Sequence, residues 1–184
     1  VAIVSGSAVL MHRWVEQVPA VLQCWFNGQE AGNAVAAVLF GDHNPSGRLP
    51  LTFPRTEDQL PPFNNDYESV EEGRGYRYYD AKGLDPLFPF GHGLSYTTFA
   101  YGELRITGEM AAGEGSIRVA VDVTNTGALT GTEVVQVYVR AVDSRVPRPM
   151  KELKGFAPLV LRPGQTQTAA VSLSAADLSF WDEE

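Results

Sequence analysis

Two carboxylates in the first quarter of the chain, Glu30 and Asp42, are the most visible candidates for paired acid–base chemistry. Hydrolysis by two carboxyl groups requires a separation of about 5–5.5 Å for a retaining mechanism and about 6.5–9.5 Å for an inverting one. The residues between them carry apolar side chains at helical spacing. Three helical turns, at a rise of ~1.5 Å per residue, would hold the two carboxylates roughly 18 Å apart. We therefore exclude them as a catalytic pair and interpret Glu30 as a residue of the helix N-terminus and Asp42 as a turn residue.

A polar stretch over residues 54–74 is the second candidate region. It is rich in Pro, Asn and Glu, which predicts a long surface loop. Loops of this length are uncommon in compact domains and often carry function. A solvated loop without a role in binding is the alternative. The end of the stretch holds an acidic cluster beside Arg74, formed by Asp66, Glu68, Glu71 and Glu72.

The sequence lacks the spacing of several other kinds of site. The three histidines, His12, His43 and His92, have no Cys or His at metal-ligand spacing, so no metal site is expected. The single cysteine, Cys24, excludes an internal disulfide, and its apolar neighbours predict a buried thiol. The glycine pair at residues 28–32 lacks the Lys-Ser/Thr of a P-loop and the third glycine of a dinucleotide-binding loop.

The first 95 residues have the element order of an α/β fold. Residues 1–5 and 20–26 are apolar runs typical of buried parallel strands, with a short helix expected over residues 11–18. A second helix is expected after Gly28, with Gly41 as its C-cap.

Two further strands are expected in this first half. Residues 48–53 are interpreted as an edge strand, because Pro50 removes a hydrogen-bond donor from the ladder. Residues 75–80, with three tyrosines, are also expected to be extended.

From Phe99 onward the pattern is that of an all-β domain. Apolar residues alternate with polar ones over residues 117–123, 134–139 and 168–173, and turn residues separate the runs. About six strands are expected, which is typical of an immunoglobulin- or fibronectin-III-like sandwich. The chain is therefore interpreted as a partial α/β sandwich over residues 1–95, followed by an all-β fibronectin-III-like sandwich over residues 96–184 that is expected to be truncated at its C-terminal end.

Composition narrows the possible partners. The formal net charge is −8 and both halves are acidic, so neither a nucleic acid nor an anionic membrane surface is an expected partner. No apolar run approaches the ~20 residues of a membrane span. The chain begins and ends inside expected strands or domains, so we interpret it as a fragment. An α/β half with so few strands is expected to expose apolar surface, to be poorly soluble alone and to associate with itself.

Six segments of the chain resemble glycoside hydrolase family 3. Residues 28–54 (GQEAGNAVAAVLFGDHNPSGRLPLTFP), 75–80 (GYRYYD) and 86–99 (PLFPFGHGLSYTTF) are similar to the C-terminal α/β domain of that family. Residues 123–127 (VTNTG), 133–138 (EVVQVY) and 149–156 (PMKELKGF) resemble its fibronectin-III-like domain. The resemblance covers essentially the whole chain.

The resemblance implies hydrolysis of terminal, non-reducing β-D-glucosides with retention of configuration. In the family, the nucleophile is an Asp on an N-terminal (β/α)₈ barrel, and the acid/base of the β-glucosidase branch is a Glu upstream of this chain. Neither motif is present, so this chain is expected to hold no catalytic residue and, alone, to be inactive. No cofactor is implied, and the β-glucoside or oligosaccharide substrate would be met through the barrel domain.

The family architecture gives the long loop a possible role. It would form a rim over the sugar pocket of the barrel, where Tyr67 and Tyr76 could stack on a sugar ring and Arg74 could hydrogen-bond its hydroxyls. Two alternatives stay open at this point. The chain could be a non-catalytic carbohydrate-binding or structural module, or the parent could be a β-xylosidase or related exo-glycosidase, since these share the same C-terminal layout.

Overall fold

The computed structural model describes residues 1–61, 74–111 and 113–180. The chain divides into two compact units, which are described separately. The first comprises Val1–His43, Gly47–Gly93 and Pro147–Met150, and the second Asn44–Ser46, Leu94–Val146 and Lys151–Glu184. None of the helices formed by the described residues combines the length and the apolar character needed to cross a bilayer.

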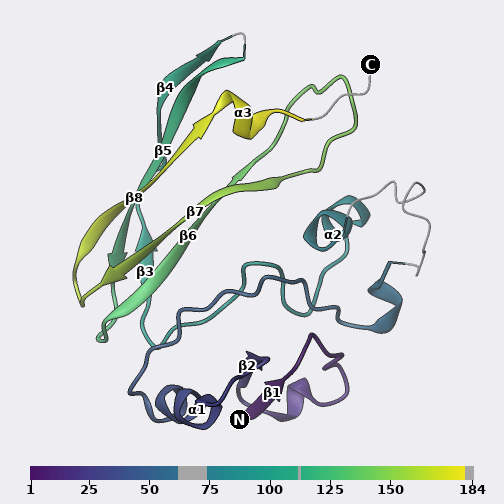
Figure 1. Ribbon diagram of the computed structural model, residues 1–184, viewed down its shortest axis with the longest axis vertical. Coiled ribbons are helices and arrows are strands. Elements are labelled where there is room, and N and C mark those ends of the chain that lie inside the picture. Colours follow the sequence, from purple (N-terminus) through teal and green to yellow (C-terminus); the bar gives the residue numbers. More distant parts are fainter. Residues whose placement is uncertain (62–73, 112, 181–184) are drawn as a thin grey trace. The chain divides into compact units, whose positions relative to one another are not determined.

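The first unit opens with a parallel pair of strands, as the sequence predicts. β1 (Ala2–Ser5) lies beside β2 (Val21–Trp25), with Ala2 opposite Val21 (Figure 1). The register shifts between Val4 and Ser5, and Trp25 at the end of β2 has a φ of 54°. The expected helix between the strands is only a 3₁₀ turn, η1 (Val15–Gln17). A longer helix is disfavoured there, because two β-branched valines lower the helix propensity and Pro19 follows directly after the segment.

The second predicted helix is present as α1 (Ala31–Phe40). Gly41 follows it with a φ of 86°, a left-handed conformation that glycine adopts without steric cost, so the predicted C-cap is confirmed. Glu30 is the N-cap residue rather than a member of the first turn, and its carboxylate accepts a hydrogen bond from the Asn33 side chain. Cys24 is half-buried, so the expectation of a fully buried thiol was wrong.

The expected edge strand at residues 48–53 is not a regular strand. Leu49 exchanges backbone hydrogen bonds with Gly91 and His92, and Phe53 forms an isolated antiparallel bridge with Phe88. Pro50 lies between these two contacts and has no N–H to continue a ladder, which explains why the pairing is interrupted.

The prediction of a strand at residues 75–80 was wrong, because this segment is the helix α2 (Tyr76–Lys82). The three tyrosines favour a strand by propensity, but Tyr76 and Tyr79 are three residues apart and share one face of a helix. Tyr79 is buried and anchors that face. A 3₁₀ turn, η2 (Glu57–Gln59), lies before residues 62–73, which are outside the described ranges.

Aromatic side chains form the centre of the first unit. Phe53 is almost completely buried, and its ring centroid lies 6.1 Å from that of Trp25 and 6.3 Å from that of Phe88. Trp25 takes part in this core only partly, since its ring packs on Phe53 while the residue stays half-exposed.

The second unit is a fibronectin-III-like sandwich, and its described residues form six strands (Figure 1). In one sheet β5 pairs with β3 and β4, and also with β8, while the other sheet is the antiparallel pair of β6 and β7. A single turn of helix, α3 (Ala175–Leu178), follows β8 and starts with a capping box between Ser174 and Asp177. The strand bounds are β3 Phe99–Tyr101, β4 Arg105–Ala111, β5 Glu114–Asn125, β6 Gly131–Val139, β7 Glu152–Leu161 and β8 Thr166–Ser174.

The core of the sandwich follows the predicted alternation. Val119, Val121 and Val123 of β5 are buried and the residues between them face outward. Val121 and Val123 pack with Val135, Leu161 and Ala169 from the neighbouring strands. Because a strand repeats every two residues, this pattern alone fixes which face of β5 points into the core.

Candidate functional site

The candidate rim residues lie at the N-terminal end of α2. Arg74 is exposed, Gly75 follows with a φ of 60°, and Tyr76 is the first residue of the helix. The structure therefore places Arg74 and Tyr76 on either side of Gly75, close to the start of the helix. Tyr67, the third predicted rim residue, lies outside the described ranges.

The Tyr76 ring is held by an aromatic neighbour. Its centroid lies 4.9 Å from that of Phe90, with the ring planes tilted by 35°. The Arg77 guanidinium carbon lies 6.0 Å from the same centroid, at the outer limit of a cation–π contact. Tyr76 is half-buried rather than a free aromatic side chain. Contact with Phe90 therefore packs one aromatic ring against another at the start of α2.

The C-terminal end of α2 is closed by a Schellman motif. The Leu84 N–H donates to the Tyr79 carbonyl and the Gly83 N–H donates to the Asp80 carbonyl, while Gly83 has a φ of 63°. Burial first, and the neighbouring Tyr78 second, raise the pKa of the Tyr79 hydroxyl above its usual value. Tyr79 is therefore neutral near pH 7 and anchors the helix through its buried side chain.

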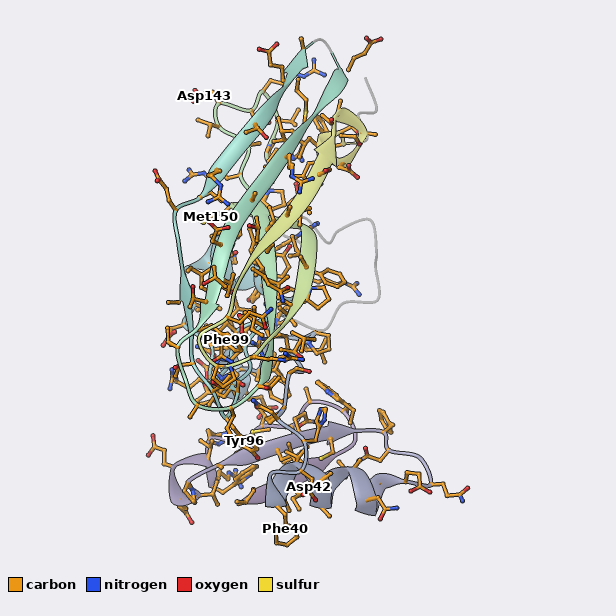
Figure 2. The ribbon with its side chains drawn as sticks, turned by 90° about the vertical axis from the view of Figure 1, so that its left-hand side faces the viewer. Phe40, Asp42, Tyr96, Phe99, Asp143 and Met150 are labelled. Carbon is orange, nitrogen blue, oxygen red and sulfur yellow. The ribbon has the colours of Figure 1, made fainter. Side chains whose placement is uncertain are left out.

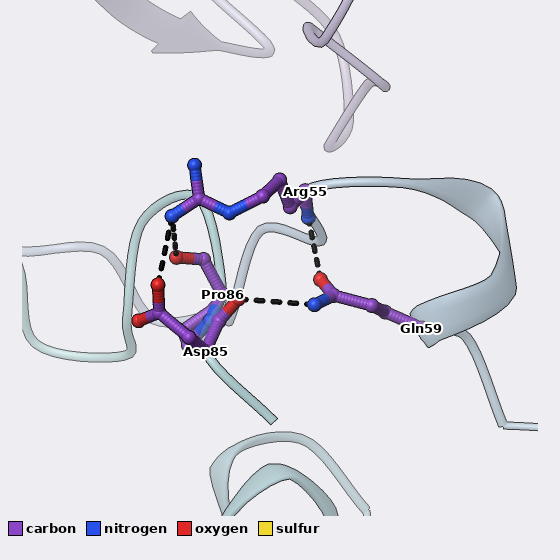
Figure 3. A network of polar contacts seen from close by, with 4 residues as sticks. All are labelled: Arg55, Gln59, Asp85 and Pro86. Atoms are coloured by element: carbon purple, nitrogen blue, oxygen red, sulfur yellow. Dashed lines mark hydrogen bonds and ion pairs between the residues drawn. The ribbon is translucent and has the colours of Figure 1, made fainter. Parts of the chain in front are cut away.

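A polar network joins the chain before α2 to the chain after it (Figure 3). The Arg55 guanidinium donates to the Asp85 carboxylate at 2.9 Å and to the Pro86 carbonyl at 3.3 Å. The Gln59 side chain accepts from the Arg55 backbone N–H at 2.7 Å and donates to the Asp85 carbonyl at 3.0 Å. We call these three side chains, of Arg55, Gln59 and Asp85, the clasp. No pattern in the sequence indicated it, because Arg55 and Gln59 lie 30 and 26 residues before Asp85, on the other side of the loop.

The carboxylates excluded as a catalytic pair are separated as expected. Glu30 precedes α1 and Asp42 follows Gly41 at its other end, so the whole helix lies between them. Asn44 organises the turn after α1, and no pattern in the sequence indicated this role. Its side-chain oxygen accepts from the Ser95 hydroxyl at 2.9 Å and the Tyr96 N–H at 2.8 Å, and its nitrogen donates to the Thr130 carbonyl at 3.0 Å.

His92 contributes to the packing of the first unit. Its ring stacks on Phe88 with centroids 5.4 Å apart and its carbonyl accepts from the Leu49 N–H. Burial, followed by the positive charge of Arg48, lowers the pKa of the His92 imidazole. Within the described ranges, no three His, Cys, Asp or Glu side chains gather in a group that could hold a metal ion.

Comparison with known protein families shows to which family the chain belongs. The model of the glycosyl hydrolase family 3 C-terminal domain matches residues 1–96, and that of the fibronectin type III-like domain matches residues 133–184. The chain belongs to glycoside hydrolase family 3. The two family domains follow one another in the order that the sequence motifs predict.

Relatives and solved structures of family 3 match the chain over nearly its whole length. The "Probable beta-glucosidase J" of Neosartorya fischeri is 47% identical over 199 residues, covering 100% of this chain and 23% of that protein. The "Xylan 1,4-beta-xylosidase" of Xylanibacter ruminicola is 46% identical over 182 residues, covering 98% of this chain and 20% of that protein. A structure of β-glucosidase 3B from Thermotoga neapolitana in complex with glucose superposes with a TM-score of 0.87 and 39% identity, over 98% of this chain and 27% of that one.

The chain thus spans about a quarter or less of the length of these family 3 relatives. It matches their C-terminal part, an α/β segment followed by a fibronectin-like sandwich.

Proposed function

We propose that the chain is the C-terminal part of a retaining, exo-acting β-glucosidase that removes terminal, non-reducing β-D-glucosyl residues. The observation that carries this proposal is the 47% identity to a protein named as a probable β-glucosidase, over the full chain and across both domains in the same order. A match of this extent makes a sandwich module unrelated to glycoside hydrolysis a poor alternative.

In this proposal the catalytic carboxylates lie outside these 184 residues. Retaining hydrolysis needs a nucleophile and an acid/base about 5–5.5 Å apart, and the helix between Glu30 and Asp42 keeps these two carboxylates from forming such a pair. The chain would contribute a wall of the sugar pocket through Arg74, Tyr76 and Tyr67, with residues 1–95 as the α/β part and residues 96–184 as the sandwich. The substrate would be a β-glucoside or oligosaccharide bound mainly by the barrel domain.

The test compares the longer protein with the isolated 184-residue chain. With an aryl β-glucoside as substrate, the longer protein should release the chromophore and the isolated chain should not. Turnover by the isolated chain that a point substitution within it abolishes would refute the assignment of catalysis to the missing part. Absence of turnover by the longer protein on any aryl β-glycoside would refute the enzymatic proposal itself.

A β-xylosidase is the second candidate, because the Xylanibacter ruminicola relative named for that activity is 46% identical over 98% of this chain. Glucosides and xylosides differ by the C6 hydroxymethyl group, and contacts in the barrel pocket would distinguish the two sugars by this group. The ratio of kcat/KM for aryl β-glucoside and aryl β-xyloside in the longer protein separates the two candidates. A ratio above one supports the first.

We also propose that the isolated chain associates with itself. Phe26 and Phe40 are 83% and 84% exposed, and the Phe40 side chain projects away from α1 (Figure 2). Exposed aromatic side chains of this size favour association in water. Sedimentation of the isolated chain as a stable monomer at all concentrations would contradict this proposal, whereas Phe26→Ser with Phe40→Ser should shift it toward monomer.

A further inference from the structure

We propose that the clasp residues Arg55, Gln59 and Asp85 are positioning residues that fix α2, and through it place Arg74 and Tyr76 for the glycoside. This inference rests on the proposed function, because it assigns these two side chains to the rim of a sugar pocket. It adds three residues that do not touch the substrate and that act through the helix.

The first step is the set of bonds that the clasp makes. The clasp has four hydrogen bonds between 2.7 and 3.3 Å long: one links Arg55 to Gln59, and the other three join these two residues to residues 85–86. Three of the four involve a backbone atom, namely the Arg55 N–H and the carbonyls of Asp85 and Pro86. The clasp therefore fixes the course of the main chain on both sides and does more than pair two surface charges (Figure 3).

The second step is the short connection from the clasp to the helix. Asp85 comes directly after Leu84, whose N–H closes the Schellman motif on Tyr79. On the far side of the clasp, Phe53 and Phe88 form the antiparallel bridge in the aromatic core. The C-terminal end of α2 is thus tied, through residues that are adjacent in sequence, to the aromatic core of the first unit.

The third step leads to the rim. The chain that leaves the clasp at Pro86 continues to Phe90, whose ring packs on Tyr76 at the start of α2. Both ends of α2 are consequently supported by residues 84–90, and the clasp holds these residues in place. Arg74 lies two residues before Tyr76, so its backbone follows the orientation of the helix.

The solvent exposure of Arg55 and Asp85 limits how much the clasp stabilises the fold. The side chains of Arg55 and Asp85 are 49% and 88% exposed, so water screens their attraction and the ion pair alone stabilises the fold little. Loss of the clasp should therefore leave the protein folded and widen the range of α2 orientations. The apparent affinity for a ligand falls in proportion to the fraction of molecules in the binding orientation.

The experiment is a variant series in the longer protein, assayed with an aryl β-glucoside. Arg55→Ala and Gln59→Ala should each raise KM about two- to fivefold, the range expected for losing exposed charged and polar contacts. They should leave kcat nearly unchanged, since the rim would contact the ground state and the transition state alike. Asp85→Asn keeps an acceptor for Arg55 and should have a smaller effect. The double variant Arg55→Asp with Asp85→Arg, which restores opposite charges, should recover part of the loss.

Arg105 provides the matched control. Its guanidinium also pairs with an exposed carboxylate, that of Asp122, but in the sandwich. Arg105→Ala should therefore leave KM unchanged. Amide hydrogen exchange over residues 76–82 gives a second readout that does not depend on activity, and should become faster in Arg55→Ala and Gln59→Ala only.

The outcomes separate the two proposals. Unchanged KM together with unchanged exchange at α2 would overturn the clasp proposal, as would a fall in kcat with KM preserved. If exchange became faster in these two variants while the wild-type protein cleaved no glycoside, the clasp would be retained as a support of α2, but its role in sugar binding would be overturned along with the proposed function. If Arg55→Ala lowered the melting temperature, the milder Asp85→Asn variant would decide.

Discussion

The Tyr76 ring packs against Phe90 with the ring centroids 4.9 Å apart, so a residue proposed to meet the substrate is also part of the protein's own packing. The two roles make different demands on the side chain. Packing needs the ring alone, whereas a hydrogen bond to a sugar needs the hydroxyl group.

Substitutions at Tyr76 can separate these demands. Tyr76→Ala should destabilise the protein by about 1–2 kcal/mol, because it removes an aromatic pair and half-buried apolar area. Tyr76→Phe should preserve stability and, if the hydroxyl contacts the sugar, raise KM about two- to tenfold. Urea titration of each variant and steady-state kinetics of the longer protein provide the two measurements. An unchanged KM in Tyr76→Ala would remove Tyr76 from the rim.

The sandwich could be predicted from the sequence in detail. Valines at positions 119, 121 and 123 alternate with Ala120 and Asp122, and a period of two is specific to strands with one buried face. This local pattern needs no knowledge of the partner strands. The same holds for the end of α1, where a glycine at position 41 signals a left-handed cap before any tertiary contact is considered.

The rim could be predicted only in part. The aromatic residues of 76–80 favour a strand by propensity, whereas the structure has a helix that ends at Gly83 and buries Tyr79. The cap glycine is a local signal, but the burial of Tyr79 depends on tertiary packing. The clasp could not be predicted from the sequence. Hydrogen bonds between residues about 30 positions apart do not follow the helix or strand periodicity of the sequence. The sequence therefore indicates which residues flank the loop, but not the contacts that hold them.

Asn125 is a buried polar centre in the sandwich whose loss should be costly. Its side-chain oxygen accepts from the Thr97 hydroxyl and the Gly127 N–H, and its nitrogen donates to the carbonyls of Leu129 and Leu161. Asn125→Ala should lower the free energy of unfolding by about 2–4 kcal/mol, because it leaves several buried groups without partners. Thr97→Val, which removes one of these bonds, should cost about 1 kcal/mol. Equal losses in both variants, measured by urea titration, would contradict a central role for Asn125.

Leu161 tests the core of the sandwich. Its side chain is 0% exposed and packs with the valines of β5, whereas the neighbouring Val160 is 62% exposed on the outer face of β7. Leu161→Ala should destabilise the protein by about 2–5 kcal/mol through lost contacts and a cavity. Val160→Ala should change stability by less than about 0.5 kcal/mol. Similar values for the two variants would mean that the strand faces are assigned incorrectly.

Asp122 should make the stability of the sandwich depend on pH. Hydrogen bonds from Arg105 first, and from Thr168 second, lower the pKa of the Asp122 carboxyl from 3.8 to about 2. Because the folded protein holds the ionised form, the stabilisation is present above the unfolded pKa and is lost as the pH falls from about 4 toward 2. Asp122→Asn should therefore lower the melting temperature at pH 7 and reduce its decline between pH 4 and pH 2. Thr168→Val, which removes only the weaker of the two contacts, should give an intermediate curve, and parallel curves for all three proteins would show that Asp122 does not control this transition.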